Sequence, residues 1–281
     1  MDCTVGGAGH AAALLERIQP GGRLLGLDRD PAALERARER LGEGTVELRR
    51  ADFRDLAAQA AAASISAADG ILFDLGFSSH QVDDPERGFS FRQEGPLDMR
   101  LDPDSPTTAA DLLNSLSGAE LARVIRDYGE ERWSARIAEF VVRRRPLSST
   151  GDLARAVEAA IPRAAWPRDI HPATRTFQAL RIAVNDELGS LEAVLPAAAG
   201  LLRPGGRMAV ICFHSLEDRA VKAFYNRESR DCVCPPEQPV CTCGHRASLR
   251  VLTRRPLRPS AEEGDRNPRA RSARLRAAEK L

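Results

Sequence analysis

The sequence of 281 residues contains no run of about 18 or more apolar residues, the length that a membrane-spanning helix requires. Its first residues also lack the basic segment followed by an apolar segment that is typical of an export signal. No internal repeat is present. With 43% hydrophobic residues, the chain can bury a sizeable core. We therefore expect a cytoplasmic globular protein that has no membrane partner.

Lysine is scarce, since it supplies only two of the 41 basic residues, and the formal net charge is only +1. That charge is unevenly distributed. The segment Gly244–Leu281 holds eleven Arg or Lys and four Asp or Glu, a net charge of +7, which leaves −6 for the rest of the chain. A basic C-terminal tail on a near-neutral protein indicates a polyanionic partner, although a solvated, loosely ordered tail would have the same composition.

Short apolar runs alternate with helix-like segments in most of the chain, which predicts an α/β fold with a parallel sheet. The strand candidates are Arg23–Leu27, Thr45–Leu48, Ile71–Phe73 and Arg207–Phe213. The stretch 105–186 breaks the alternation with a mostly helical pattern. We predict one domain from residues 1–104 and 187–281, interrupted by a helical insertion at 105–186.

A glycine-rich segment, Asp2–His10, precedes the helical run Ala11–Ile18. Such a turn lets backbone N–H groups approach a ligand closely. Asp28 ends the next strand candidate, where a carboxylate can accept hydrogen bonds from a ribose diol. The loop does not match G-x-G-x-x-G, and Asp2 would repel a pyrophosphate but attract a cationic amino-acid end. This combination favours S-adenosylmethionine, while an ordinary turn with a capping Asp is the alternative.

Two further segments carry polar residues after strand candidates. Asp52-Phe53 could serve an adenine, with Phe53 stacking and Asp52 accepting from the amino group. Asp74–Gln81 follows the third strand candidate, at the edge where open α/β sheets bind ligands. The segments Arg87–Phe91 and Gly95–Arg100 mix polar and turn-forming residues, which predicts a shaped loop.

At these residues the chain resembles the ribosomal RNA small subunit methyltransferase H family, and the resemblance covers essentially its whole length. The matching segments are Asp2–His10, Asp69–Arg100, Tyr128–Ile137, His171–Leu188, Phe213–Lys222 and Asn267–Arg276. The resemblance implies a Rossmann-like class I methyltransferase sheet with a helical insertion. It also implies methyl transfer from S-adenosylmethionine to the N4 amino group of a cytidine in the decoding region of 16S rRNA, with the small ribosomal subunit as partner and the insertion as the RNA-recognition domain.

Carried over by position, the resemblance places cofactor contacts on seven residues: Ala8, Gly9, His10, Asp28, Phe53, Asp74 and Gln81. The family has a further segment, with a first strand, before the position of Asp2. Ala8 stands where the family has glycine, so a positive φ there would be strained. His80 stands where the family commonly has proline, which would loosen the loop that holds Gln81.

Methylation of a cytosine amino group requires in-line positioning and an acceptor for the N4 proton, because the amine lone pair is delocalised into the ring. We expect Asp74 to be this acceptor. Ser78, Ser79 and Asp98 are the other candidates, although a local turn hydrogen bond is the simpler role for either serine. The chemistry does not require a metal, and we predict no metal among the site residues.

Four cysteines, Cys232, Cys234, Cys241 and Cys243, form two C-x-C pairs. Four thiolates could hold a tetrahedral zinc ion. The usual spacing is C-x-x-C, however, and four reduced thiols in a surface loop are the alternative. The sequence leaves this choice open.

Other functions remain as alternatives. A methyltransferase for another RNA or for DNA is the nearest, and the segment Asp74-Leu75-Gly76-Phe77 argues against DNA because it lacks the Pro-Pro of DNA amino-methyltransferases. An NAD-dependent oxidoreductase is disfavoured by Asp2 and by the glycine pattern. An inactive RNA-binding form would result if the segment before Asp2 were truly missing. The sequence does not decide between a monomer and a homodimer.

Overall fold

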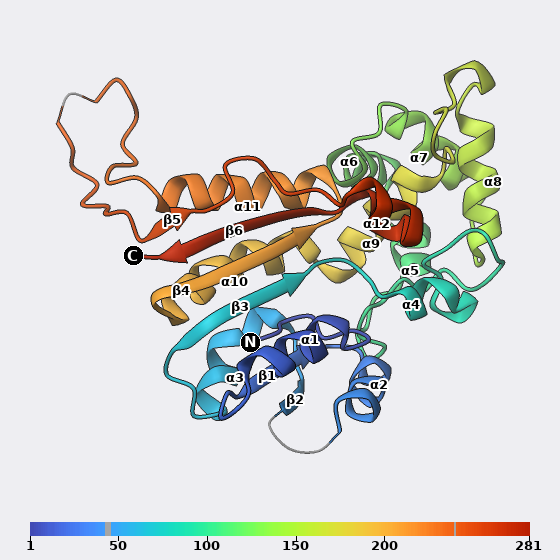
Figure 1. Ribbon diagram of the computed structural model, residues 1–281. Coiled ribbons are helices and arrows are strands. Elements are labelled where there is room, and N and C mark those ends of the chain that lie inside the picture. The colour runs from blue at the N-terminus through green and yellow to red at the C-terminus, as the bar shows by residue number, and fades with distance from the viewer. Residues whose placement is uncertain (43–45, 239) are drawn as a thin grey trace. The chain divides into compact units, whose positions relative to one another are not determined.

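The computed structural model describes residues 1–42, 46–238 and 240–281 (Figure 1). The predicted strand start at Thr45 lies outside these residues. The chain forms two compact units: unit 1 comprises Met1–Gly76 and Leu188–Leu281, and unit 2 comprises Phe77–Glu187. The segment predicted as a helical insertion, 105–186, lies within unit 2, which also includes residues 77–104.

The sheet of unit 1 contains two parallel strand pairs, which are joined by the first residues of the chain. Strand β1 pairs with β2, and β3 pairs with β4. Asp2 bridges Gly26 of β1 on one side and Leu72 of β3 on the other, both in parallel orientation. The bounds of these strands are β1 Leu24–Asp28, β2 Val46–Arg50, β3 Ala68–Asp74 and β4 Leu202–Cys212.

The chain first adds strands β1 and β2 on one side of Asp2 and then strands β3 and β4 on the other side, so the strand order reverses at Asp2. Helices separate the parallel strands along the chain, so the fold is Rossmann-like, as expected. The helices of unit 1 are α1 Gly9–Ile18, α2 Pro31–Leu41, α3 Leu56–Ala62, α10 Glu187–Leu201 (from Leu188 on), α11 Ser215–Glu228 and α12 Ala261–Arg266. Asp30 caps α2 by accepting from the Ala32 N–H at 3.0 Å, and Pro31 occupies the first turn.

The end of the chain differs from the loosely ordered tail that its composition allows. Strand β6, Arg274–Lys280, pairs antiparallel with β4 and with β5, Leu249–Val251 (Figure 1). Ala278 is fully buried and Arg276 is only 5% exposed. Four of the eleven basic residues of Gly244–Leu281 therefore lie in strands of the sheet, namely Arg250, Arg274, Arg276 and Lys280.

Unit 2 is helical and has its own core. Its helices are α4 Ser79–Asp83, α5 Ala109–Ser115, α6 Gly118–Gly129, α7 Ser134–Arg143, α8 Thr150–Ala160 and α9 Thr174–Asn185. Side chains such as Leu113, Leu121, Ile125, Ile137 and Leu153 are fully buried and pack together. Asp186 adopts a φ of +46° and ends α9 before α10 begins.

Among the described residues, no helix is both long enough and apolar enough to cross a membrane.

Asp218 of α11 joins the helix to β6. Its carboxylate accepts from Arg276 Nε at 2.6 Å and from Arg274 Nη1 at 3.3 Å. Burial raises the pKa of Asp218, but hydrogen bonds and attraction from the two arginines outweigh burial and hold it below the usual value. The ion pairs of Asp218 stabilise the folded chain only while its carboxyl is ionised. Because the pKa of Asp218 is lower in the folded than in the unfolded chain, this stabilisation is fully present above the unfolded pKa of about 4. It is lost as pH falls through the folded pKa.

We therefore expect Asp218→Asn to lower the free energy of unfolding by about 2 kcal/mol near pH 7, because it leaves the buried Arg276 without its counter-charge. Urea unfolding followed by circular dichroism measures this, and the difference from the parent protein should shrink below about pH 4. Asp69→Asn is the control, since Asp69 pairs with Arg203 in solvent and should cost less than about 1 kcal/mol. Equal losses for both variants would contradict the role of the Asp218 pair.

Candidate functional site

The carboxyl ends of the parallel strands in unit 1 gather acidic side chains at one edge of the sheet. Strand β1 ends at Asp28 and β3 ends at Asp74. Asp2 lies between these strands, directly before the glycine-rich loop. Asp52 and Phe53 follow the end of β2. The predicted site residues of unit 1 therefore share the sheet edge at which such folds bind ligands.

The glycine-rich loop has an unusual backbone. Gly6 and Ala8 adopt positive φ values of 51° and 57°, and Ala8 is completely buried. A non-glycine residue in this conformation is strained by roughly 1–2 kcal/mol, so the strain that the sequence predicted for a positive φ at Ala8 is present. A Cβ at Gly7 would meet no atom within 4 Å, and one at Gly9 would only reach Arg40 Nη1 at 4.0 Å. The backbone at these glycines is open to a ligand.

Asp28 ties this loop to the end of β1. Its Oδ2 accepts from the Gly6 N–H at 2.8 Å, and its Oδ1 accepts from the Asp30 N–H at 2.9 Å. Burial raises the pKa of Asp28 above its usual value, and the two backbone hydrogen bonds oppose that rise. Each carboxylate oxygen can accept more than one hydrogen bond. Asp28 can therefore hold the loop and still accept from hydroxyl groups of a ligand.

Asp2 and Asp74 each keep a buried oxygen that has no hydrogen-bond partner within the described part of the chain, namely Asp2 Oδ2 and Asp74 Oδ1. The other Asp2 oxygen accepts from the Thr4 N–H at 3.2 Å, and Thr4 Oγ1 accepts from the Asp74 N–H at 2.6 Å. Burial raises the pKa of Asp2 to about 6. An unpaired buried carboxylate oxygen is costly, so the two oxygens favour a ligand that brings N–H donors or positive charge.

His10 extends this acidic group, because its Nε2 lies 3.4 Å from Asp74 Oδ2. The hydrogen bond to Asp74 is the main reason why the pKa of His10 is raised, and partial burial opposes it. His10 is thus stabilised in its protonated form beside two carboxylates. It can hold the Asp74 side chain in place while the second Asp74 oxygen stays available.

Asp52 and Phe53 differ in the contacts that their side chains already make within the chain. Asp52 Oδ1 accepts from the Arg54 N–H at 2.9 Å, and its Oδ2 forms an ion pair with Arg29 Nη2 at 3.0 Å. The Phe53 ring packs edge-on against Phe73, with centroids 5.8 Å apart, and the Arg29 guanidinium lies 5.6 Å from the Phe53 centroid. Phe53 is therefore fixed as a ring surface, whereas Asp52 mainly caps and pairs.

The remaining predicted site residues, Ser78, Ser79, Gln81 and Asp98, belong to unit 2. Ser78 and Gln81 form a capping box at the start of α4. Gln81 Oε1 accepts from the Ser78 N–H at 2.8 Å, and Ser78 Oγ accepts from the Gln81 N–H at 3.3 Å. Ser79 is exposed on the first turn of this helix. The local hydrogen bond considered for the serines is therefore present at Ser78.

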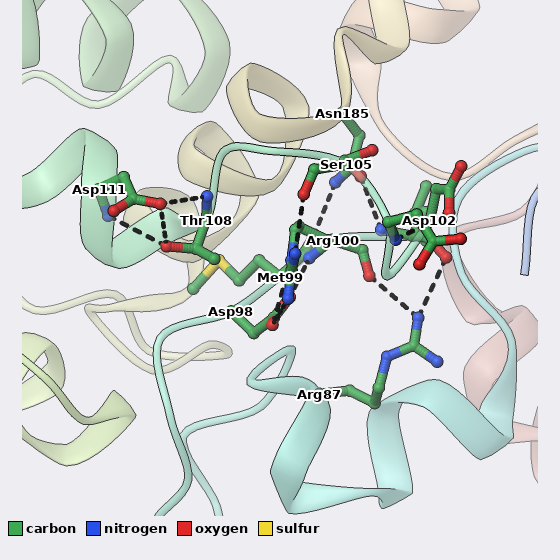
Figure 2. Close-up of polar contacts among 11 residues, drawn as sticks. Arg87, Asp98, Met99, Arg100, Asp102, Ser105, Thr108, Asp111 and Asn185 are labelled. Carbon is green, nitrogen blue, oxygen red and sulfur yellow. Dashed lines mark hydrogen bonds and ion pairs between the residues drawn. The ribbon is translucent and has the colours of Figure 1, made fainter.

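Asp98 is bound to Arg100, as Figure 2 shows. Arg100 Nε donates to Asp98 Oδ1 at 3.0 Å, and Arg100 Nη2 donates to Asp98 Oδ2 at 2.7 Å. The Arg100 N–H also donates to Asp98 Oδ1, at 2.9 Å. Both carboxylate oxygens serve this bidentate pair, which is among the stronger polar contacts in proteins. Asp98 is accordingly a weaker candidate for proton acceptor than Asp74.

Met99, between Asp98 and Arg100, is fully buried and adopts a φ of +61°. Its carbonyl accepts from Asn185 Nδ2 at 2.8 Å, and its N–H donates to the Arg87 carbonyl at 3.0 Å. Arg87 Nη2 donates to the carbonyls of Arg100 and Leu101 (Figure 2). Because these hydrogen bonds maintain the strained backbone of Met99, the loop has a fixed shape. Sequence reasoning found the shaped loop but not Arg87 and Asn185 as its supports.

An aromatic and cationic stack lies near the start of unit 2. The Phe77 and Phe89 rings stack with centroids 5.5 Å apart and an interplanar angle of 15°. The Arg181 guanidinium lies 4.7 Å from the Phe77 centroid, and Glu187 holds Arg181 by a buried bidentate pair at 2.7 and 2.8 Å. Phe77 is nevertheless 39% exposed. An exposed ring that is so firmly supported is suited to stacking on a planar ligand.

The comparisons with known proteins agree with one another. The model of the MraW methylase family matches residues 1–281. The chain is 55% identical to ribosomal RNA small subunit methyltransferase H of Heliobacterium modesticaldum and 56% identical to that of Geobacter sulfurreducens, covering all of this chain and 92% of each relative. A chain from Streptococcus mutans, described as a methyltransferase in complex with SAH, is 11% identical. That match covers 100% of this chain and 86% of the other, with a TM-score of 0.42. The agreement of the family model and the relatives over the whole sequence shows that the chain belongs to the MraW methylase family.

Proposed function

We propose that this chain transfers a methyl group from S-adenosylmethionine to the exocyclic N4 of one cytidine in the decoding region of 16S rRNA. Membership of the family and the names of its relatives support a methyltransferase of small-subunit rRNA. The observation that carries the proposal is the set of carboxylates at this sheet edge around the open glycine loop, two of which, Asp2 and Asp74, have a buried oxygen without a hydrogen-bond partner among the described residues.

The residues of unit 1 fit S-adenosylmethionine. We assign Asp28 to the ribose hydroxyls, Phe53 to the adenine ring, and the Ala8–His10 backbone with Asp2 to the amino-acid end. The unpaired Asp2 oxygen supports an ammonium partner, because a positive charge would relieve the cost of burying that carboxylate. When bound, the cofactor supplies a sulfonium methyl that is already strongly electrophilic. The chain itself orients the cofactor.

Asp74 is the proton acceptor that we propose. One of its oxygens contacts His10, and the other is buried without a hydrogen-bond partner among the described residues. Hydrogen bonding of the cytosine N4–H to that oxygen would draw electron density onto the amine and take up its proton. Ser78 and Asp98 are less suited, because one caps α4 and the other is paired with Arg100. The Gln81 side chain is already engaged, because its Oε1 caps α4 by accepting from the Ser78 N–H.

We infer that unit 2 recognises RNA, with Phe77 as the surface on which the target base stacks. Single-stranded or splayed bases are commonly read by aromatic stacking, and a base in folded rRNA must be unstacked before N4 can react. The basic residues of Gly244–Leu281 would add phosphate contacts. We propose the cytoplasm as the location of the protein. The formation of a homodimer is a further prediction under this proposal.

The identity and position of the methylated nucleoside test the proposed function as a whole. We expect labelled cofactor and purified protein to give N4-methylcytidine at one site of 16S rRNA in small-subunit particles, and far less label in short oligonucleotides, since wide contacts must offset the unstacking cost. Nucleoside mass spectrometry measures both. Label in C5-methylcytidine would refute the amine chemistry, and equal labelling of particles and oligonucleotides would refute recognition by unit 2.

Asp28→Asn tests the cofactor assignment. Loss of the charge should weaken S-adenosylmethionine binding by about 10- to 100-fold, because hydrogen bonds to a charged group contribute about 1.5–3 kcal/mol. Since burial raises the pKa of Asp28, its contribution to the parent affinity should fall as pH is lowered toward that pKa, and the variant should lose this contribution to the pH dependence while keeping the one that comes from Asp2. Titration calorimetry measures both effects. Asp55→Asn, at an exposed position of the 3-10 turn Phe53–Asp55, is the control. Unchanged affinity in Asp28→Asn would overturn the assignment.

Phe77→Leu tests base stacking. The leucine keeps apolar contact with Phe89 but removes the ring face, which should lower kcat/KM for small-subunit particles by about 5- to 100-fold, given that stacking on one base contributes about 1–3 kcal/mol. Cofactor affinity should not change. Phe140→Leu, on α7 of the same unit, is the matched aromatic control. A weaker cofactor affinity with unchanged kcat/KM for RNA would rule out the stacking role.

A further inference from the structure

The four clustered cysteines lie in a loop that no hydrophobic core holds. The loop joins α11 to β5, and its described residues from Ser229 to Ser248 form no helix or strand. None of those residues is buried, and Val233 and Val240 are 39% and 68% exposed. A loop longer than about 12–15 residues without secondary structure is uncommon in a compact domain unless something else orders it.

The cysteine sulfurs nevertheless converge. The Sγ atoms of Cys232, Cys234, Cys241 and Cys243 all lie within 4.8 Å of one another. Cys241 Sγ is 3.6 Å from Cys243 Sγ, which is 3.9 Å from Cys232 Sγ. Four sulfurs in a tetrahedron around a zinc ion, each with a Zn–S bond of about 2.3 Å, stand about 3.8 Å apart. The two sulfur–sulfur distances match that spacing and are far longer than a disulfide bond of about 2.05 Å.

The backbone around the sulfurs also suits thiolate ligands. The Val233 N–H donates to Cys243 Sγ at 3.5 Å, and the Cys234 N–H donates to Cys232 Sγ at 3.4 Å. Gly244 adopts a φ of +61°, so the chain can turn away directly after the last cysteine. N–H groups aimed at sulfur stabilise negative charge on a metal-bound thiolate, as the hydrogen bonds around metal ligands do in general.

Contacts with α11 and the chain end fix both ends of the loop. The Ser248 N–H donates to the Glu228 carbonyl at 2.8 Å, and the Leu281 N–H donates to the Ser248 carbonyl at 3.1 Å. His245 Nε2 lies 3.1 Å from the Arg227 carbonyl oxygen, so this nitrogen is engaged by α11. Between these ends, the described residues of the loop bond mainly to one another: the Ala247 N–H donates to Asp231 Oδ1 at 3.2 Å, and Gln238 Nε2 donates to Thr242 Oγ1 at 2.7 Å.

We propose that Cys232, Cys234, Cys241 and Cys243 bind one structural zinc ion that cross-links this loop. Tetrahedral S4 coordination favours zinc among the common metals, and binding releases the thiol protons to solvent as four thiolates form. With four protein ligands the site is closed, so no position remains for a reacting water. Figure 1 shows the loop at the end of the sheet opposite the arrowheads of β3 and β4. The ion therefore orders the loop and does not take part in methyl transfer.

The test uses the full chain, purified under reducing conditions without a metal-affinity tag. We expect elemental analysis to find one zinc per chain, and cobalt substitution to give the absorption bands of tetrahedral thiolate coordination. Cys232→Ser combined with Cys243→Ser should lose the metal. Limited proteolysis should then cut the loop at least tenfold faster, while cofactor binding is retained.

Val233→Ser is the matched control, because it changes a neighbouring residue in the same loop without removing a ligand, and it should keep the zinc. Thiol titration provides a second readout: in the metal-bound protein the four loop thiols should react slowly, and a chelator should make them react fast. Four freely reactive thiols without bound metal would overturn the proposal. Two disulfides, seen as a mass lower than that of the reduced chain by four hydrogen atoms, would overturn it as well.

Discussion

The backbone hydrogen bonds of Met1–Cys3 are the interaction on which the rest of unit 1 depends. Asp2 exchanges hydrogen bonds with Leu25 and Leu27 of β1, while Met1 and Cys3 do so with Leu72 of β3. Without these bonds, β1 and β2 would be a separate pair from the four strands β3, β4, β6 and β5. Because the site residues end strands on both sides of this junction, the junction also sets the spacing between Asp28 and Asp74.

Sequence patterns located most strand ends and helices because both signals are local. Proline at a first turn and an acidic cap define α2, and apolar runs followed by Asp28 or Asp74 define β1 and β3. Strand β6 escaped prediction because Arg274–Lys280 is rich in Arg and Ala, without β-branched residues. Its place depends on pairing with β4, which is distant in the sequence, and on Asp218, which compensates the buried Arg276.

In the candidate site, too, some features follow from local sequence signals and others depend on contacts between distant residues. Residue types after apolar runs predicted that Asp28, Asp74 and Phe53 share one edge of the sheet, and the topology does bring them to that edge. The sequence could not show that Ser78 caps a helix or that Asp98 is paired with Arg100, because both facts depend on side-chain geometry. Nor could it show that Met99 takes a left-handed conformation, which Asn185 and Arg87 hold in place from distant positions of the chain.

The burial of Asp2 has a consequence for measurements of binding. With a pKa of about 6, this carboxyl is partly protonated in slightly acidic solution. A cation that binds beside it favours the ionised form, so binding expels a proton from the fraction of molecules that still carry one. The apparent affinity for a cationic ligand should then rise as pH increases through 6. The observed enthalpy should also depend on which buffer takes up the released proton, even though the contacts to the ligand stay the same.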